Sequence, residues 1–357
     1  MKKNFKRRDF IKKAGVAAAA ATAVSSFPAP AIAADRIEVN CVATWGRGYP
    51  GLGTGGEAVS QRISDLSDGR IVVNHYAGGE RVGPLDVFTE VSSGNAQMYN
   101  SADYYWVGQH PGWGFFASVP FGMIATEING WIRHGGGQEL WDELGDEFGL
   151  KNFMAGNSGV QMGGWFNKEI NSVKDFEGLK MRMGGVGSKI LNEFGASAQY
   201  LPASEIYLAL ERGRIDATEF SLPIIDKDFG FNQIAKYYYY PGWHQPGSAD
   251  VLMINMDVWN GMSSHEQAMY EAACQTSLQW TLSYAPAAQT PQIEVFEAGG
   301  TIVKEFPLDV LAELRVMTER VLGEEAKKDA LYGEAYNSMK AFVASSGRWT
   351  SLQTLPL

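Results

Sequence analysis

The sequence contains too little cysteine for a disulfide framework. Among 357 residues there are two cysteines, Cys41 and Cys274, and no C-x-x-C spacing that would indicate structural zinc or a redox pair. The sequence leaves open whether these two cysteines pair with each other. A chain of this length buries enough surface to fold without disulfides or metal. With 45% hydrophobic and 20% charged residues, the composition excludes disordered and collagen-like chains.

Basic charge is also scarce. The chain has 30 Lys and Arg residues against 40 Asp and Glu residues, which gives a formal net charge of −10. No nucleic-acid partner is expected, because neutralising phosphates requires a basic face. After residue 33, no segment approaches ~18 uninterrupted apolar residues, so no membrane span is expected there.

The first 33 residues have the features of an export signal. A basic start precedes the apolar stretch Ala14–Val24, and the small-residue site Ala31-Ile32-Ala33 follows. Within it, the segment Arg7–Lys12 resembles the twin-arginine motif R-R-x-F-[LI]-K. We therefore expect residues 1–33 to be a signal peptide and the mature protein to begin near Ala34 in the periplasm.

The pattern of apolar residues predicts an α/β fold. A strand at 36–45, a glycine turn at 51–56 with a helix after it, a strand at 71–76 and a helix at 84–93 give the order β-α-β-α, which favours a mostly parallel sheet. Further helices are expected at 137–148, 188–194, 205–212, 264–284, 308–322 and 324–344, and further strands at 161–166, 179–183 and 301–304.

Motifs for catalysis are incomplete. Gly51–Gly56 satisfies G-x-G-x-x-G, but the next strand ends in Asn74-His75-Tyr76 without the carboxylate that a dinucleotide ribose requires. Gly184–Lys189 lacks the order of a phosphate-binding loop and reads as a glycine turn. The five histidines lack metal-ligand spacing. We expect neither an enzyme nor a catalytic cofactor, and an exported dinucleotide- or metal-dependent oxidoreductase remains the alternative.

Two segments carry a family resemblance. Asp175–Arg182 resembles the D-L-x-G-L-K-x-R stretch of the solute-binding proteins of TRAP (tripartite ATP-independent periplasmic) transporters, and Glu211–Glu219 is similar to their A-L-x-x-G-x-I-D-A-x-E segment. The resemblance covers essentially the whole chain. It implies a two-lobed α/β periplasmic binding-protein fold with a ligand cleft between the lobes and a long C-terminal helical spine. Lobe I would comprise 34–157 and 246–300, lobe II 158–245 and 301–322, and a helical tail 323–357.

Several other segments resemble one branch of this family, the binders of 2-oxo and 2-hydroxy monocarboxylates such as pyruvate and lactate. Each is short, and together they are more specific than any one motif. They are Gly51–Gly55, Tyr104–Gly108, Val119–Met123, Gln161–Phe166 and Tyr237–Trp243.

The resemblance implies how the acid is held. Arg182 ends a strand, and its planar guanidinium can bind a carboxylate through two parallel charge-assisted hydrogen bonds. Tyr104 or Tyr105 would add a hydroxyl from the other lobe, and the sequence does not say which.

A cation beside the acid is also implied, sodium or calcium. Its ligands would be the side chains of Gln161 and Glu219 and the main-chain carbonyl of Phe220, all hard oxygen donors. Phe220 stands where the branch often has Trp. Gln245, a further residue expected at the ligand, is neutral where the pattern has a carboxylate.

The expected partners are a small organic acid and the membrane subunits of a TRAP transporter, and a homodimer is an open alternative for the oligomeric state. Another acid is the first alternative ligand: a C4-dicarboxylate, a sugar acid or an aromatic acid. A second basic residue in the cleft would favour a dicarboxylate, and Arg47 is the candidate.

Overall fold

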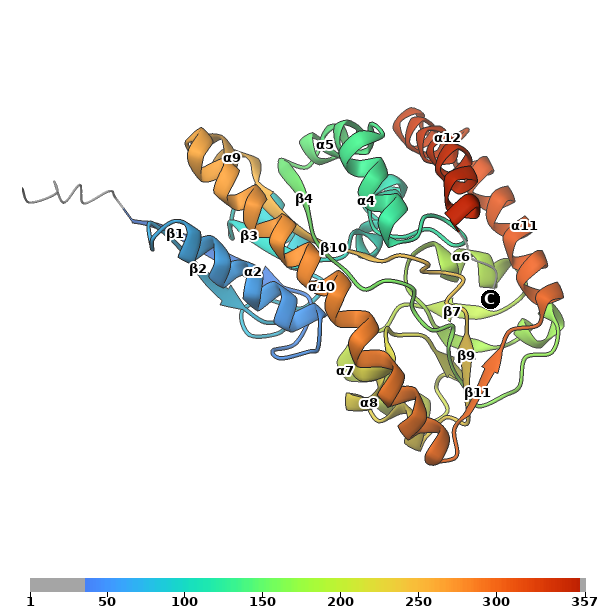
Figure 1. The fold of residues 1–357 in the computed structure, drawn as a ribbon. Helices are drawn as coiled ribbons and strands as arrows, with labels where there is room; N and C mark the ends of the chain where they lie inside the picture. The colour runs from blue at the N-terminus through green and yellow to red at the C-terminus, as the bar shows by residue number, and fades with distance from the viewer. Residues whose placement is uncertain (1–35, 354–357) are drawn as a thin grey trace, which may run out of the picture. The chain divides into compact units, whose positions relative to one another are not determined.

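Two mixed β-sheets form the framework of the protein in a computed structural model that describes residues 36–353 (Figure 1). The expected export signal, residues 1–33, lies outside the described residues. The first sheet has the order β2-β1-β3-β10-β4 and the second β11-β9-β5-β8-β6-β7. The strands are β1 (Ile37–Ala43), β2 (Ile71–Tyr76), β3 (Met98–Ser101), β4 (Leu150–Asn157), β5 (Gly164–Phe166), β6 (Lys180–Arg182), β7 (Ser197–Gln199), β8 (Ala217–Thr218), β9 (Tyr237–Tyr240), β10 (Ala249–Asn255) and β11 (Ile302–Glu305).

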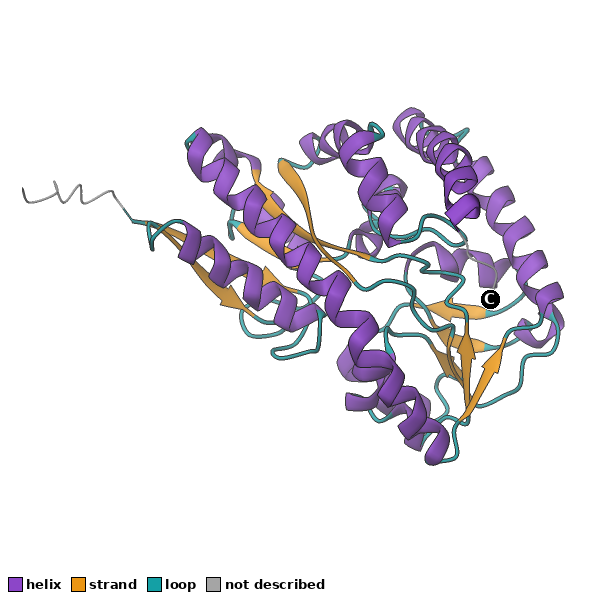
Figure 2. Ribbon diagram, viewed as in Figure 1, coloured by secondary structure: helices purple, strands orange, loops and turns teal. Residues whose placement is uncertain are grey.

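Helices flank both sheets (Figure 2). They are α2 (Leu52–Leu66), α3 (Val87–Ser92), α4 (Ala125–His134), α5 (Gly137–Asp146), α6 (Gly185–Glu193), α7 (Ala203–Glu211), α8 (Pro223–Asp228), α9 (Met256–Gly261), α10 (Ser264–Ala298), α11 (Leu308–Glu325) and α12 (Ala330–Gln353), with short 3₁₀ turns η1 (Asp103–Trp106), η2 (Pro111–Phe116), η3 (Val173–Phe176) and η4 (Phe231–Gln233). Among the described residues, none of these helices has the length and apolar character needed to cross a membrane.

The first sheet is half parallel and half antiparallel. β1 pairs in parallel with β2 and β3, whereas β10 lies antiparallel to both β3 and β4. The expectation of a mostly parallel sheet was therefore wrong. β10 follows β9 of the second sheet through residues 241–248, and not through a helical crossover of its own sheet, so it is free to enter antiparallel.

The second sheet brings three parallel strand ends together. β6 pairs in parallel with β7 and with β8, while β5 is antiparallel to β8 and β9. β5 is shorter than the strand expected at 161–166, because the chain turns at Gly164 with φ +118°. Gln161 therefore lies in the loop before β5.

Two glycine runs expected as turns belong to helices. α2 already begins at Leu52, and α6 begins at Gly185. A Cβ on Gly53 would lie 2.3 Å from the carbonyl oxygen of Gly46, and one on Gly56 would lie 2.2 Å from Asn100 Oδ1. The glycines of the G-x-G-x-x-G motif thus let α2 pack closely against its neighbours.

The C-terminal helices also depart from expectation. α10 continues from Ser264 to Ala298, beyond the expected end at 284, although Pro286 and Pro291 lie inside it. Its last turns pack on the second sheet, where Phe296 meets Trp165 edge-on with ring centroids 5.0 Å apart. α12 begins at Ala330, not 324, because Asp329 Oδ1 accepts a hydrogen bond from the Tyr332 amide (2.7 Å) at its start.

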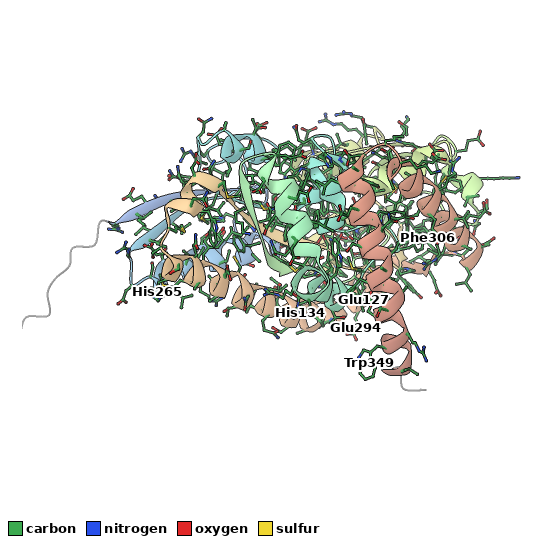
Figure 3. The ribbon with its side chains drawn as sticks, turned by 90° about the horizontal axis from the view of Figure 1, so that it is seen from above. Glu127, His134, His265, Glu294, Phe306 and Trp349 are labelled. Atoms are coloured by element: carbon green, nitrogen blue, oxygen red, sulfur yellow. The ribbon has the colours of Figure 1, made fainter. Side chains whose placement is uncertain are left out.

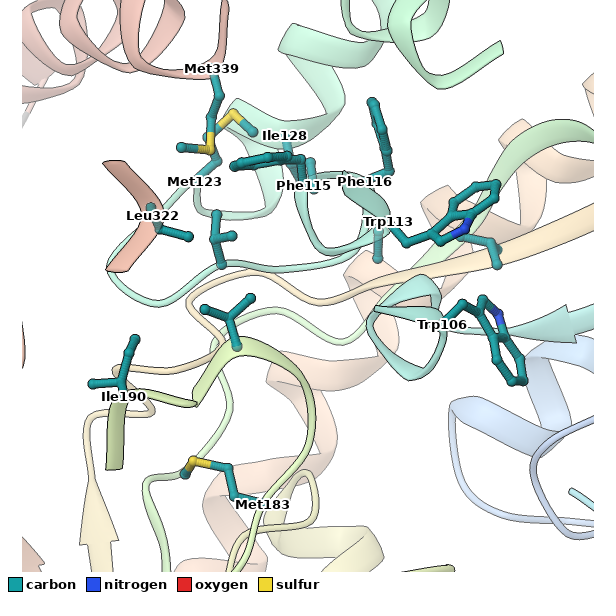
Figure 4. Packing of buried hydrophobic residues seen from close by; sticks show 14 of the residues in the cluster. Trp106, Trp113, Phe115, Phe116, Met123, Ile128, Met183, Ile190, Leu322 and Met339 are labelled. Atoms are coloured by element: carbon teal, nitrogen blue, oxygen red, sulfur yellow. The ribbon is translucent and has the colours of Figure 1, made fainter. Parts of the chain in front are cut away.

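Aromatic and aliphatic side chains pack together in the largest core cluster of the described residues (Figure 4). Phe116 stacks on both Trp131 and Trp141, with ring centroids 5.4 Å apart in each pair. Trp113, Phe115 and Phe116 of η2 are all buried in this cluster. Cys41 and Cys274 are both buried and free, so they form no disulfide.

The strands of the two sheets come from different parts of the chain. Those of the first sheet lie within 37–157 and 249–255, and those of the second within 164–240 and 302–305. Residues 158–163 and 241–248 pass from one sheet to the other, and α10 contacts β4 as well as β11. The lobe boundaries given above stay a prediction.

Candidate functional site

Arg182 lies buried at the end of β6, with 2% of its surface exposed. Parallel pairing places it opposite Thr218 of β8, so that Glu219 follows at the same edge of the sheet. Arg182 Nη1 donates hydrogen bonds to Oε1 and to the main-chain oxygen of Glu219, both at 2.6 Å. The arginine expected to bind a ligand carboxylate is thus already paired with a carboxylate of the chain.

Most donors of this guanidinium are in use. Of its five N–H groups, two on Nη1 go to Glu219, and Nε donates to the Leu201 carbonyl oxygen (3.3 Å). The Tyr200 ring covers one face of the guanidinium. The two-bond fork expected from the sequence is therefore not open in this arrangement, and the remaining donor capacity lies on Nη2.

Glu219 is buried and ionised. Its Oε1 also accepts from the Gly184 amide (2.9 Å), and its Oε2 lies 3.3 Å from His244 Nε2. Burial by itself raises the pKa of Glu219, but the charge of Arg182, His244 and the Gly184 amide together lower it below the ordinary value. For Arg182, burial lowers the pKa and the charge of Glu219 raises it, with a net rise. Both members of the pair are thus charged.

Aromatic rings surround the guanidinium. Its central carbon lies 4.9 Å from the ring centroid of Tyr200 and 5.3 Å from that of Phe220. The Tyr105 ring lies 5.0 Å from that of Tyr200, and the hydroxyls of Tyr104 and Tyr105 are 3.5 Å apart. Burial raises the pKa of all three tyrosines, so their hydroxyls stay neutral donors.

The loop residues expected at the cation lie beside this pair. The Gln161 amide donates to the Gln245 carbonyl oxygen (3.1 Å), and the Met162 amide donates to that of Ser221 (3.4 Å), one residue after Phe220. Within the described residues, the side-chain oxygens Gln161 Oε1 and Gln245 Oε1 are buried and accept no hydrogen bond. Buried carbonyl oxygens without donors fit a hard cation such as sodium or calcium.

Two site residues were not identified from the sequence. Tyr200 follows Gln199, which pairs with Arg182 across parallel strands, so the rule that strand ends meet at one sheet edge could have found it. His244 is buried against Glu219 and carried no signal beyond its place next to Gln245.

Other candidates lie elsewhere. Arg47, the second basic residue considered for a dicarboxylate, is 55% exposed and pairs with Glu80 at 2.6 Å. His134 and His265 are exposed on α4 and α10 (Figure 3). In the part of the chain that the structure describes, no three His, Cys, Asp or Glu side chains gather in a way that could hold a metal.

The chain is similar to known proteins over most of its length. The family described as bacterial extracellular solute-binding protein, family 7, matches residues 44–329. The monocarboxylate 2-oxoacid-binding periplasmic protein of Nostoc sp. (strain PCC 7120) is 35% identical over 306 residues, which cover 85% of this chain and 84% of that protein.

Solved structures of similar proteins hold ligands. A TRAP periplasmic solute binding protein from Colwellia psychrerythraea with bound calcium and pyruvate superposes with a TM-score of 0.86 at 34% identity, covering 89% of this chain and 97% of that one. One from Pseudoalteromonas atlantica T6c with bound sodium and pyruvate gives the same TM-score, identity and coverage, 0.86, 34%, 89% and 97%. The two-sheet α/β fold of this chain is thus the fold of those periplasmic binding proteins.

Proposed function

Because the chain belongs to family 7 of the bacterial extracellular solute-binding proteins, we propose that it binds a 2-oxo or 2-hydroxy monocarboxylate such as pyruvate or lactate. It delivers the acid to the membrane subunits of a TRAP transporter and performs no chemistry on it. The observation that carries the proposal is the buried guanidinium of Arg182, placed among three tyrosine side chains. The protein works in the periplasm, and residues 1–33 direct it there as a twin-arginine signal.

The chain's own residues bind and orient the acid. The N–H groups on Arg182 Nη2 face its carboxylate, and the neutral hydroxyls of Tyr104 or Tyr105 add donors. A charge-assisted hydrogen bond in a buried site is stronger than one in solvent, so a single carboxylate is sufficient for recognition.

Gln161, Glu219 and the carbonyl of Phe220 hold a sodium or calcium ion beside the acid, with Gln245 adjoining them. The fit rests on the unpartnered oxygens of the two glutamines. When bound, the ion supplies positive charge to an oxygen at C2 of the ligand, which favours 2-oxo and 2-hydroxy acids.

Thermal unfolding of ligand-free protein tests the ligand class. The panel is pyruvate, lactate, succinate, a sugar acid and an aromatic acid, each with sodium, with calcium and with chelator. Ligand at ~100 times its dissociation constant adds roughly 2.7 kcal/mol of stability, a shift of several degrees. Shifts only with monocarboxylates bearing oxygen at C2 support the proposal. Shifts only with dicarboxylates, sugar acids or aromatic acids favour those alternatives, and a cofactor absorbance in purified protein favours the oxidoreductase.

Arg182→Lys tests the site itself. Lysine keeps the positive charge that Glu219 requires but lacks the planar donors, so pyruvate affinity falls at least tenfold by calorimetry. Arg47→Lys, the matched control at an exposed ion pair, keeps wild-type affinity. A loss of pyruvate affinity in Arg47→Lys with none in Arg182→Lys would mean that the carboxylate binds at Arg47.

Light scattering of the same preparations distinguishes a monomer from a homodimer.

A further inference from the structure

Glu219 and Arg182 form an ion pair inside the binding site itself. We propose that Glu219 makes acid binding depend on the cation, because it neutralises Arg182 before any ligand arrives. The inference rests on the proposed function and identifies Glu219 as the residue that couples binding of the acid to binding of the cation.

The pair is neutral as a unit and hidden from water. Arg182 is 2% exposed and Glu219 1% exposed, and Arg182 Nη1 donates both of its hydrogens to Glu219. The carboxylate oxygen Oε1 sits 2.6 Å from Nη1, the position that a ligand carboxylate would take on this edge of the guanidinium. The side chain of Glu219 thus takes a place on the Arg182 guanidinium that a ligand carboxylate could otherwise occupy.

An acid entering alone brings an uncompensated negative charge into this buried site. A buried charge without a partner is strongly unfavourable, and Arg182 cannot fully serve two carboxylates. The remaining acceptor capacity of Glu219 lies on Oε2, where His244 Nε2 is its partner at 3.3 Å. The unpartnered oxygen Gln161 Oε1 belongs to the loop that adjoins this segment. A positive charge held there compensates Glu219 and leaves Arg182 to the incoming acid.

Replacing Glu219 by Gln separates this role from a purely positioning one. The amide has the shape of the carboxylate and can still accept from Arg182 and Gly184, but it leaves the guanidinium charge unneutralised. We expect pyruvate binding to Glu219→Gln in chelator and sodium-free buffer to be at least tenfold tighter than to wild type. Adding sodium or calcium should change the affinity of the variant by less than about twofold, against at least tenfold for wild type.

Glu266→Gln is the matched control. Glu266 is 3% exposed and pairs at 2.6 Å with Arg70, whose side chain is 45% exposed, so this variant removes the charge of a buried glutamate paired with an arginine away from the site. This control keeps the cation dependence of wild type. Calorimetric titration with pyruvate, in each cation and in chelator, gives all the ratios.

Weaker cation-free binding by Glu219→Gln than by wild type, or an unchanged cation dependence, would overturn the inference. If wild type binds no 2-oxo acid with any cation, the proposed function itself has failed, which is a different result. Should Glu219→Gln not fold, wild type provides the second test with pyruvamide, the uncharged amide of pyruvate. The fold-change in affinity on adding the cation should be at least five times smaller for pyruvamide than for pyruvate. Equal fold-changes would contradict the role of charge.

Discussion

At the residue scale, Asp250 shows how far burial alone changes a carboxylate. Its side chain lies across from Gly156 on the neighbouring strand, where an added Cβ would come within 2.8 Å of Asp250 Oδ2. Within the described residues, Oδ1 is buried and accepts no hydrogen bond. Burial raises the pKa of Asp250 to about 8. The residue is thus protonated in the folded protein at neutral pH and ionised in the unfolded chain.

Asp250→Asn should therefore make stability less dependent on pH. The folded pKa lies above the unfolded value of 3.8, so the folded state binds the extra proton, and stability falls as pH rises from about 4 to about 8. One such group contributes a slope of about 1.4 kcal/mol per pH unit within that window. Urea unfolding at pH 5 and pH 8 should show a smaller fall for Asp250→Asn than for wild type. The exposed Asp257→Asn should keep the wild-type slope, and equal slopes in all three proteins would refute this account.

The arrangement of the candidate site was predictable in part. Resemblance located Arg182 and Glu219, and the parallel order of β7, β6 and β8 explains why both reach one sheet edge together with Tyr200. The ion pair between Arg182 and Glu219 was not predictable, because it depends on which side chains are buried together and on the donors left over, neither of which the spacing of residues specifies. The contact of His244 with Glu219 was not predictable for the same reason.

At the scale of elements, a capping box fixes the start of α10. Ser263 Oγ accepts from the Glu266 amide (3.3 Å), and Glu266 Oε2 accepts from the Ser263 amide (2.8 Å). Glu266 Oε1 also accepts from Arg70 (2.6 Å) just before β2. The cap therefore satisfies free amides of the helix and ties α10 to the first sheet.

Ser263→Ala should lower the free energy of unfolding by about 1 kcal/mol, the usual loss for an N-cap serine. Ser264→Ala removes the next hydroxyl, on an exposed residue inside the helix, and should change stability by less than about 0.5 kcal/mol. Chemical unfolding of the two variants beside wild type measures both. Equal effects would mean that the hydrogen bonds of Ser263 contribute nothing.

The departures from expectation at α10 and α2 share one cause. Pro286 and Pro291 signal a helix end, yet burial of Gln292 and Phe296 stabilises α10 past them. The glycines at 51–56 signal a turn, yet the close approach of Gly46 and Asn100 requires them inside α2. Local signals were outweighed by packing against residues far away in sequence. The strands β1, β2, β6 and β11, with strong local patterns, lie where expected.

At the scale of the whole molecule, the candidate site draws residues from both sheets. Tyr104 and Tyr105 follow β3 of the first sheet, whereas Tyr200 and Arg182 come from the second, and the rings of Tyr105 and Tyr200 are 5.0 Å apart. Tyr105 and Tyr200 touch through their aromatic rings. A ligand that binds residues of both sheets would therefore add interactions to this contact. Binding should then favour arrangements in which the two sheets lie close together.

Small-angle scattering should accordingly record a smaller radius of gyration for wild type with saturating pyruvate and cation than for the same protein without ligand. The ligand favours the arrangement with the two sheets close together only when its carboxylate binds Arg182 while a tyrosine hydroxyl from the first sheet donates to it. Arg182→Lys, measured at the concentrations that saturate wild type, should show little or no decrease, because it binds the acid too weakly to bridge the sheets. Binding proved by calorimetry without any decrease in wild type would mean that the two sheets keep one arrangement and that the acid enters without domain motion. A decrease of equal size in Arg182→Lys would show that closure responds to the cation alone.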